Sequence, residues 1–163
     1  MHSNSEVIAG KPAPDFALPG SNGKIHLLHE YRGKKVILYF YSKNNAPSCT
    51  KQAEAFKKSF QAFGKLNAVI IGISKDSLKS HNSFIEKLKL PYVLLSDQTT
   101  SVAQLYTAVT PPVNLGELPK FERTTFVIDE GGQIIQIYRK VRISRHVDTL
   151  LQFLASYTAS QQA

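Results

Sequence analysis

The chain has 163 residues, of which 42% are hydrophobic and 20% are charged, and its formal net charge is +8 at pH 7. This length fits a single domain over residues 1–163, whose core needs neither a metal nor disulfides. The one cysteine excludes an intramolecular disulfide and a thiolate zinc site, and the histidines lack metal-ligand spacings. We therefore expect no metal and no cofactor. The longest apolar runs have the length of a strand, which excludes a membrane-spanning helix.

The basic charge has two interpretations, which are attraction to nucleic acid, membranes or anionic substrates, and an ordinary basic surface. The lysines and arginines are scattered and no nucleic-acid motif accompanies them, which favours the second interpretation. We expect no nucleic-acid or membrane partner. The N-terminus lacks a basic and then apolar signal segment, so we expect a soluble cytoplasmic protein. The polar ends, residues 1–5 and 159–163, are expected to be frayed.

The first third of the chain predicts an extended entry and a central strand. Pro12–Pro19 has three prolines, which favour an extended or turning segment. A turn at Ser21–Gly23 precedes a short candidate strand, Lys24–Leu28. The run Val36–Tyr41 is aliphatic and aromatic throughout, as is typical of a strand buried on both faces.

A helix is predicted from Pro47 to Gly64. Proline suits the first turn of a helix, and glycine commonly follows the last. Cys49 falls in that first turn. Apolar side chains recur every three or four residues, as in an amphipathic helix: Ala53, Phe56, Phe60 and Phe63.

The remaining elements alternate between strands and helices. In chain order they are a strand at Ala68–Ile73, a helix capped by Asp76 or Ser77 and stopped by Pro91, a strand at Tyr92–Leu95, a short helix at Gln98–Tyr106, a long loop at Thr107–Glu122, hairpin strands at Thr124–Ile128 and Gln133–Tyr138, and a helix from about Arg145 to Tyr157. This order predicts an α/β fold with a mixed central sheet and helices on both faces.

Cys49 is the most informative residue of the chain. A helix N-terminus presents free N–H groups and a positive dipole end, which favour the thiolate and lower the pKa of a thiol. The alternative is a buried and inert cysteine that behaves as a small hydrophobic residue. Position alone does not decide between these two interpretations.

The segment YFYSKNNAPSCT, Tyr39–Thr50, resembles the active-site segment of peroxiredoxins of the bacterioferritin-comigratory-protein type, in the AhpC/TSA superfamily. The resemblance extends in order from Lys11 to Leu154. It includes five further segments: Lys11–Leu27, Gly72–Phe84, Leu90–Asp97, Arg123–Ile134 and Tyr138–His146. It implies a thioredoxin-like three-layer fold and a peroxidase that reduces hydrogen peroxide or organic hydroperoxides.

By matching position, the resemblance implies that Cys49 is the peroxidatic nucleophile and Arg123 the active-site arginine. A guanidinium can stabilise the thiolate and offer forked N–H donors to the peroxide oxygens. The alternative role for Arg123 is a surface ion pair with Asp129 or Glu130. His146 also matches a common histidine of the family, and we expect a core or capping role for it. For His81 we expect a solvated position.

The active-site loop, with Ser42, Ala46, Pro47 and Ser48, departs from the family pattern. Ser42 occupies the position of a proline, Ala46 that of a threonine, and Ser48 stands where glycine is common. In the family, the threonine hydroxyl hydrogen-bonds the cysteine sulfur. We hypothesise that Ser42, Ser48 or a water partly replaces it. The same departures favour an alternative function, a degenerate family member that acts as a redox sensor or binding module.

The resemblance also implies how the enzyme is recycled. Many members of the subgroup have a resolving cysteine at the position that Glu54 occupies here. Because the chain has no other cysteine, the Cys49 sulfenic acid must be resolved by an external thiol, such as thioredoxin, glutaredoxin or glutathione. The subgroup is often monomeric, so we expect a monomer or a weak dimer.

Overall fold

The computed structural model describes residues 7–162, so the predicted frayed segment 1–5 lies outside the described residues. At the other end, helix α5 (His146–Gln162) continues past Tyr157. Residues 159–162, which were expected to be frayed, are included in this helix, and residue 163 lies outside the described residues. Its apolar residues Val147, Leu150 and Leu154 are buried and anchor its first half.

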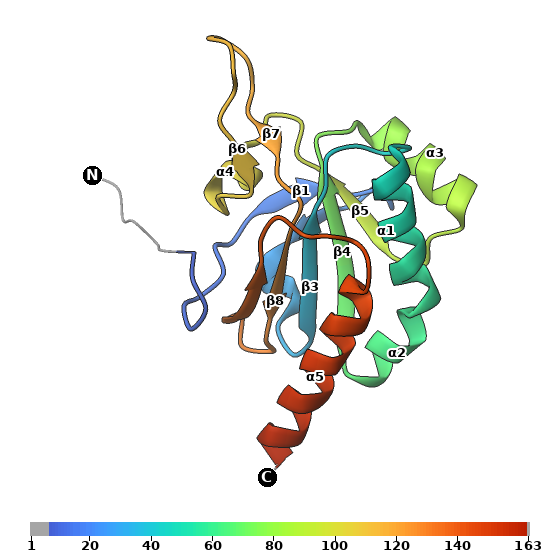
Figure 1. Ribbon diagram of the computed structural model, residues 1–163, viewed down its shortest axis with the longest axis vertical. Helices are drawn as coiled ribbons and strands as arrows, with labels where there is room; N and C mark the ends of the chain where they lie inside the picture. The colour runs from blue at the N-terminus through green and yellow to red at the C-terminus, as the bar shows by residue number, and fades with distance from the viewer. Residues whose placement is uncertain (1–6, 163) are drawn as a thin grey trace.

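A five-stranded mixed sheet forms the centre of the molecule (Figure 1), with the strand order β5-β4-β3-β8-β9. Strand β3 lies in the middle, parallel to β4 and antiparallel to β8. Every residue of β3 is buried, as the continuous apolar run that begins at Val36 predicts, and the burial includes Lys35 at its start. The bounds are Lys35–Phe40 for β3, Ala68–Ser74 for β4, Val93–Ser96 for β5, Thr124–Ile128 for β8 and Ile134–Tyr138 for β9.

Two hydrophobic clusters cover the two faces of this sheet. One face packs against α1 (Pro47–Lys58), α2 (Phe60–Lys65), α3 (Leu78–Leu88) and α5. The other packs against α4 (Ser101–Leu105) and the N-terminal segment, which holds β1 (Ala17–Pro19), β2 (Ile25–Leu27) and the short 3₁₀ helix η1 (Leu28–Tyr31). The predicted three-layer arrangement, with helices on both faces, is confirmed.

The helix predicted from Pro47 to Gly64 is interrupted at Ser59. The Ser59 N–H is shared between the carbonyls of Ala55 and Phe56, at 3.3 and 3.2 Å, which tightens the last turn of α1. The interruption leaves both Phe56 and Phe63 fully buried. The regular spacing of the phenylalanines predicts one continuous helix and does not indicate the interruption at Ser59.

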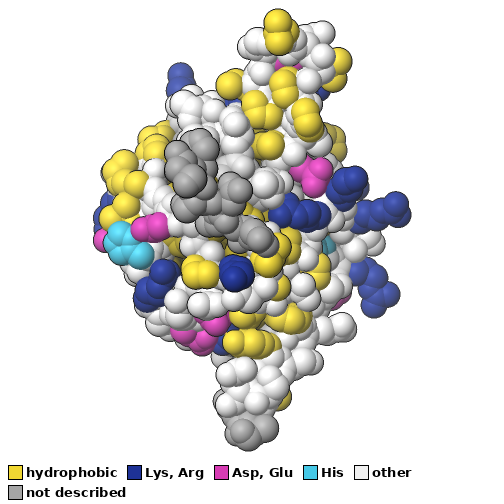
Figure 2. Space-filling view, turned by 90° about the vertical axis from the view of Figure 1, so that its left-hand side faces the viewer, with side chains coloured by type: hydrophobic (Ala, Val, Ile, Leu, Met, Phe, Trp, Pro, Cys, Tyr) yellow, Lys and Arg dark blue, Asp and Glu magenta, His cyan; other side chains and the backbone are white. Residues whose placement is uncertain are grey.

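The long segment 107–122 was predicted as a loop but contains two short paired strands. Strands β6 (Val109–Thr110) and β7 (Lys120–Phe121) are antiparallel and form the base of a projecting arm (Figure 1). Hydrophobic side chains cover much of the arm's end (Figure 2). In the segment between β6 and β7, the side chains of Val113 and Leu115 are 88% and 105% exposed. Strand β7 also brings Lys120 and Phe121 close to Ser42, with which they line one cavity.

Candidate active site

Cys49 lies in the first turn of α1, immediately beyond the carboxyl end of β3. Pro47 occupies the start of the helix, and the N-cap residue Ala46 provides no side-chain hydrogen bond to the first turn. The thiol is buried, with 1% of the residue exposed. The free N–H groups of this helix end are therefore close to a sulfur that is largely shielded from water.

Two polar side chains lie within hydrogen-bond distance of the Cys49 sulfur. The Ser42 hydroxyl Oγ lies 3.3 Å from Sγ, and Arg123 donates from Nη2 to Sγ at 3.3 Å. Ser42 belongs to the loop between β3 and α1, whereas Arg123 directly precedes β8. These residues meet because β8 is the antiparallel neighbour of β3, with Phe40 opposite Thr124.

Arg123 is itself held by two residues of α1. Its Nη2 donates to Ser48 Oγ at 2.8 Å, and its Nη1 donates to Gln52 Oε1. The alternative surface ion pair is wrong, because Glu130 pairs with Lys35 at 3.1 Å and Asp129 accepts backbone N–H groups of its own turn. The guanidinium is therefore fixed against the sulfur.

The surroundings of Cys49 favour the thiolate. Burial raises the pKa of the thiol, but the backbone N–H of Lys43, the Ser42 hydroxyl and Arg123 together outweigh burial, and the pKa lies below its usual value. A lower pKa increases the thiolate fraction at neutral pH, and the thiolate is the nucleophilic form. The inert-cysteine interpretation does not account for this arrangement.

A buried polar network fixes the loop that precedes Cys49. Asn44 accepts a hydrogen bond from Tyr41 at 2.6 Å, and its Nδ2 lies 3.0 Å from both Ser80 Oγ and His81 Nδ1. The other nitrogen of His81 lies 2.9 Å from the carbonyl oxygen of Leu95. That nitrogen must donate, so Nδ1 accepts from Asn44 and the ring is neutral.

The solvated position expected for His81 is wrong, since its exposure is 0%. Burial lowers the pKa of His81, which agrees with a neutral ring. His81 lies on the inner face of α3, where the helix packs on the sheet beside Phe84. Sequence periodicity did not reveal this, because a histidine does not itself mark an apolar face.

The core role expected for His146 is confirmed. The residue is 6% exposed, and its Nε2 lies 2.9 Å from Thr125 Oγ1. Burial, reinforced by the positive charge of Arg123, lowers the pKa of His146 to about 4. The ring is therefore neutral at neutral pH, where it packs edge-on against Phe56 and Tyr138.

Comparison with known proteins identifies the family. The model of the AhpC/TSA family matches residues 9–137. Peroxiredoxin Bcp of Bacillus subtilis is 42% identical over 89% of this chain and 93% of its own length. This chain therefore belongs to the AhpC/TSA family of peroxiredoxins.

Solved structures agree with this assignment and with a thioredoxin-like fold. Peroxiredoxin Q of Xanthomonas campestris superposes with a TM-score of 0.83 at 30% identity, over 88% of this chain and 91% of that one. BcpB of Mycobacterium tuberculosis superposes with a TM-score of 0.84 at 31% identity, over 91% of this chain and 96% of that one. The predicted fold class is confirmed.

Two polar residues of the site were missed in the sequence. Gln52 follows Cys49 by one helical turn, a spacing that places both on the same side of α1. Its amide is buried, with Oε1 bound to Arg123 and Nε2 without a partner among the described residues. Asn44 was assigned only to a polar loop, although its side chain holds that loop to α3. The helical spacing could have revealed Gln52, whereas the contacts of Asn44 depend on the tertiary fold.

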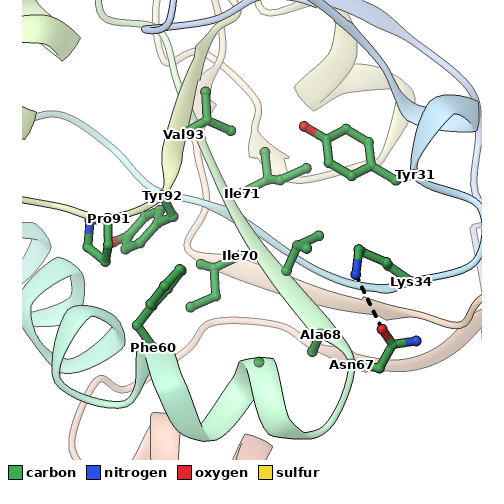
Figure 3. A pocket seen from close by; sticks show the side chains of 12 residues that line it. Tyr31, Lys34, Phe60, Asn67, Ala68, Ile70, Ile71, Pro91, Tyr92 and Val93 are labelled. Atoms are coloured by element: carbon green, nitrogen blue, oxygen red, sulfur yellow. Dashed lines mark hydrogen bonds between the residues drawn. The ribbon is translucent and has the colours of Figure 1, made fainter.

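A second cavity lies away from the cysteine (Figure 3). It has a volume of about 310 Å³ and is lined by Phe60, Tyr92 and the beginning of β4, with neither Cys49 nor Arg123 in its wall. Figure 3 shows one hydrogen bond between residues of its wall, which Lys34 Nζ donates to Asn67 Oδ1 at 3.5 Å. Tyr92 also donates to the carbonyl of Ala53 in α1. We assign no chemistry to this cavity.

Residues 7–162 contain neither a metal-binding cluster nor a membrane-spanning helix. No group of three or more His, Cys, Asp or Glu side chains there could hold a metal ion. Within the same range, no helix is long and apolar enough to cross a membrane.

Proposed function

We propose that this family member reduces hydroperoxides at Cys49, with Arg123 as the electrostatic partner of the reacting sulfur. The observation that carries this proposal is the 3.3 Å contact between Arg123 Nη2 and Cys49 Sγ. A fixed guanidinium stabilises the thiolate before reaction and offers N–H donors where negative charge develops on the peroxide. Ser42 supports the same thiolate from the other side of the loop.

The chemical step transfers one oxygen atom to sulfur. The thiolate attacks one peroxide oxygen, the O–O bond breaks, and the bonding pair leaves with the other oxygen. That oxygen takes a proton and departs as an alcohol or as water, while Cys49 becomes a sulfenic acid. Neither a metal nor an organic cofactor takes part in this step.

An external thiol then restores the enzyme. Its sulfur attacks the Cys49 sulfur, water leaves, and a mixed disulfide forms. A second thiol attacks the mixed disulfide, which releases reduced Cys49 and an oxidised disulfide product. The single cysteine supports this one-cysteine cycle, because the chain contains no partner for an internal disulfide. Glutathione, glutaredoxin and thioredoxin are the candidate reductants.

Both hydrogen peroxide and organic hydroperoxides are proposed as substrates. The bacterioferritin comigratory protein of Xanthomonas campestris, whose solved structure is 30% identical in sequence to this chain, has alkyl peroxide reduction activity. The reductants named above are supplied by reducing compartments, so we also propose a cytoplasmic location. We also predict that the protein is a monomer or a weak dimer, which sedimentation velocity would check. We predict no binding to nucleic acid, which retention on DNA at low salt would check.

Stopped-flow mixing of the reduced protein with hydrogen peroxide tests the function. We expect stoichiometric loss of the Cys49 thiol and formation of sulfenic acid, at a rate far above that of free cysteine. The Cys49→Ser variant should show neither. If Cys49 reacted no faster than free cysteine, the peroxidase proposal would be rejected, and the alternative function of a redox sensor or binding module would replace it.

A further inference from the structure

A cavity of about 490 Å³ opens beside the cysteine loop. Its wall consists of Ser42, Lys43, Lys75, Asp76, Lys120 and Phe121. Strands β3 and β4 are parallel and both end at this edge, where open α/β sheets commonly bind their ligands. The volume is within the range of small-molecule sites, roughly 300–1,000 Å³. It is larger than hydrogen peroxide requires.

The wall of this cavity is positively charged. Lys43, Lys75 and Lys120 come from three separate segments, and all three are exposed. Among residues 7–162, none of their ammonium groups forms an ion pair with a carboxylate. The one acid in the wall, Asp76, accepts hydrogen bonds on Oδ2 from the Asn44 N–H at 2.9 Å and the Ser74 hydroxyl at 2.6 Å. These two hydrogen bonds partly offset the negative charge that the Asp76 carboxylate would otherwise present to the cavity.

The cavity adjoins the reacting sulfur. Ser42 forms part of the wall, and its hydroxyl is 3.3 Å from Cys49 Sγ. Arg123 also contacts this sulfur, but it is held by Ser48 and Gln52 and does not line the cavity. Two separate sets of cationic groups therefore lie in the region of the sulfur. One is the fixed guanidinium of Arg123, and the other is the three lysine ammonium groups of the cavity wall.

We propose that this cavity binds the carboxylates of a small anionic thiol of the glutathione class and directs that thiol to oxidised Cys49. This inference rests on the proposed function, which leaves resolution to an external thiol. Arg123 already provides the cation next to the peroxide, so the lysines are available for a second reactant. Ammonium groups attract carboxylates without requiring one geometry, which suits a flexible peptide thiol.

A double-mixing experiment measures the thiol step on its own. The sulfenic acid is first formed with one equivalent of hydrogen peroxide and then mixed with glutathione or with uncharged 2-mercaptoethanol. The tested variants are Lys43→Gln, Lys75→Gln and Lys120→Gln. Lys24→Gln, an exposed lysine outside the cavity wall, is the matched control.

Each cavity variant should slow the reaction with glutathione by about two- to fivefold, the range expected for one exposed charge pair. The reaction with 2-mercaptoethanol should not change, and Lys24→Gln should affect neither thiol. The glutathione preference should also shrink at high salt, because salt screens exposed charges. Equal losses with both thiols, or an unchanged reaction with glutathione, would overturn the proposal.

A disulfide-exchange experiment tests the cavity without any peroxide. The Cys49 thiolate attacks one sulfur of glutathione disulfide, a mixed disulfide forms, and glutathione thiolate leaves. The lysine variants should slow this exchange relative to exchange with the uncharged bis(2-hydroxyethyl) disulfide. If peroxide oxidation failed but this charge selectivity persisted, only the peroxidase proposal would be rejected. If oxidation succeeded and the selectivity were absent, only the anionic-thiol site would be rejected.

Discussion

Ser42 Oγ lies 3.3 Å from Cys49 Sγ, on a loop whose family pattern has a proline at the position of Ser42. The same pattern has a threonine at the position of Ala46, and alanine has no hydroxyl to offer the sulfur. A hydroxyl therefore approaches the sulfur from a position four residues earlier than in the family pattern. This geometry supports the hypothesis that Ser42, rather than Ser48, replaces the family threonine, because Ser48 is bound to Arg123 instead.

Replacing Ser42 with alanine should raise the pKa of Cys49 and slow its oxidation. A hydrogen bond to a charged group contributes about 1.5–3 kcal/mol, and the exposure of Ser42 favours the lower end. We expect a rate loss of about tenfold. Stopped-flow oxidation gives the rate, and the pH dependence of alkylation gives the thiol pKa. Ser83→Ala, at an exposed position of α3, is the matched control, and an equal effect there would contradict the role given to Ser42.

Restoring the family threonine should rescue the loss of the serine. In Ala46→Thr, the hydroxyl can donate to Cys49 while its oxygen accepts a first-turn N–H, since Ala46 is an uncapped N-cap in an extended conformation. We expect a small gain in rate in the native background and a large gain in Ser42→Ala. Urea unfolding should also show about 0.5–2 kcal/mol of added stability.

The two backgrounds form a double-mutant cycle. If Ala46→Thr changed the rate by the same factor with and without Ser42, the two hydroxyls would act independently, and the replacement hypothesis would fail. A gain in stability without any gain in rate would show that the threonine caps the helix but does not reach the sulfur.

The site could be predicted in part because its reacting groups follow strong local signals. A buried strand, a proline and a cysteine in succession place Cys49 at a helix start, and the family resemblance located Arg123. The contacts among these residues depend on strand order, which periodicity does not determine. Only the pairing of β3 with β8 brings Arg123 next to Cys49.

The parts that sequence reasoning missed are polar residues whose partners are distant in the chain. The side chain of Asn44 contacts His81, and Lys43 shares a cavity with Lys120 across the fold. In the same way, Ser59 carries no glycine or proline signal, yet the helix is interrupted there. Such features arise from tertiary packing, which outweighs local propensity.

Gln52 should act as a positioning residue for Arg123. Gln52→Leu removes the Oε1 acceptor, so the guanidinium loses one of its two supports on α1. It also removes the buried Nε2, which has no partner among residues 7–162 and whose burial costs about 1–3 kcal/mol. We therefore expect slower oxidation and a higher Cys49 pKa together with unchanged or increased stability.

Opposite changes in rate and stability distinguish positioning from a general structural defect. Gln61→Leu, the same substitution at an exposed position of α2, is the matched control and should not alter the rate. Stopped-flow oxidation gives the rate, and urea unfolding of the same preparations gives the free energy of unfolding. A variant at Gln52 that lost stability and kept its rate would contradict the positioning role.

His146 should make the fold sensitive to acid. Burial, with a contribution from Arg123, lowers the pKa of His146 from 6.5 to about 4, so the unfolded state binds a proton more readily than the folded state. The contribution of the neutral ring is complete above pH 6.5 and is lost as the pH falls toward 4. The loss should be on the order of 3 kcal/mol, since each pKa unit corresponds to about 1.4 kcal/mol.

The variant His146→Phe isolates this effect, because phenylalanine keeps a ring beside Tyr138 and cannot be protonated. The variant should be less stable than the native protein at pH 7.5, since Thr125 loses its hydrogen-bond partner. As the pH falls to 4.5, this difference in the free energy of unfolding should shrink or reverse. Urea unfolding of both proteins at both pH values measures the difference. His81 titrates in the same direction but is present in both proteins, so the comparison assigns the change to His146. A pH-independent difference would show that His146 is not the group whose protonation weakens the fold.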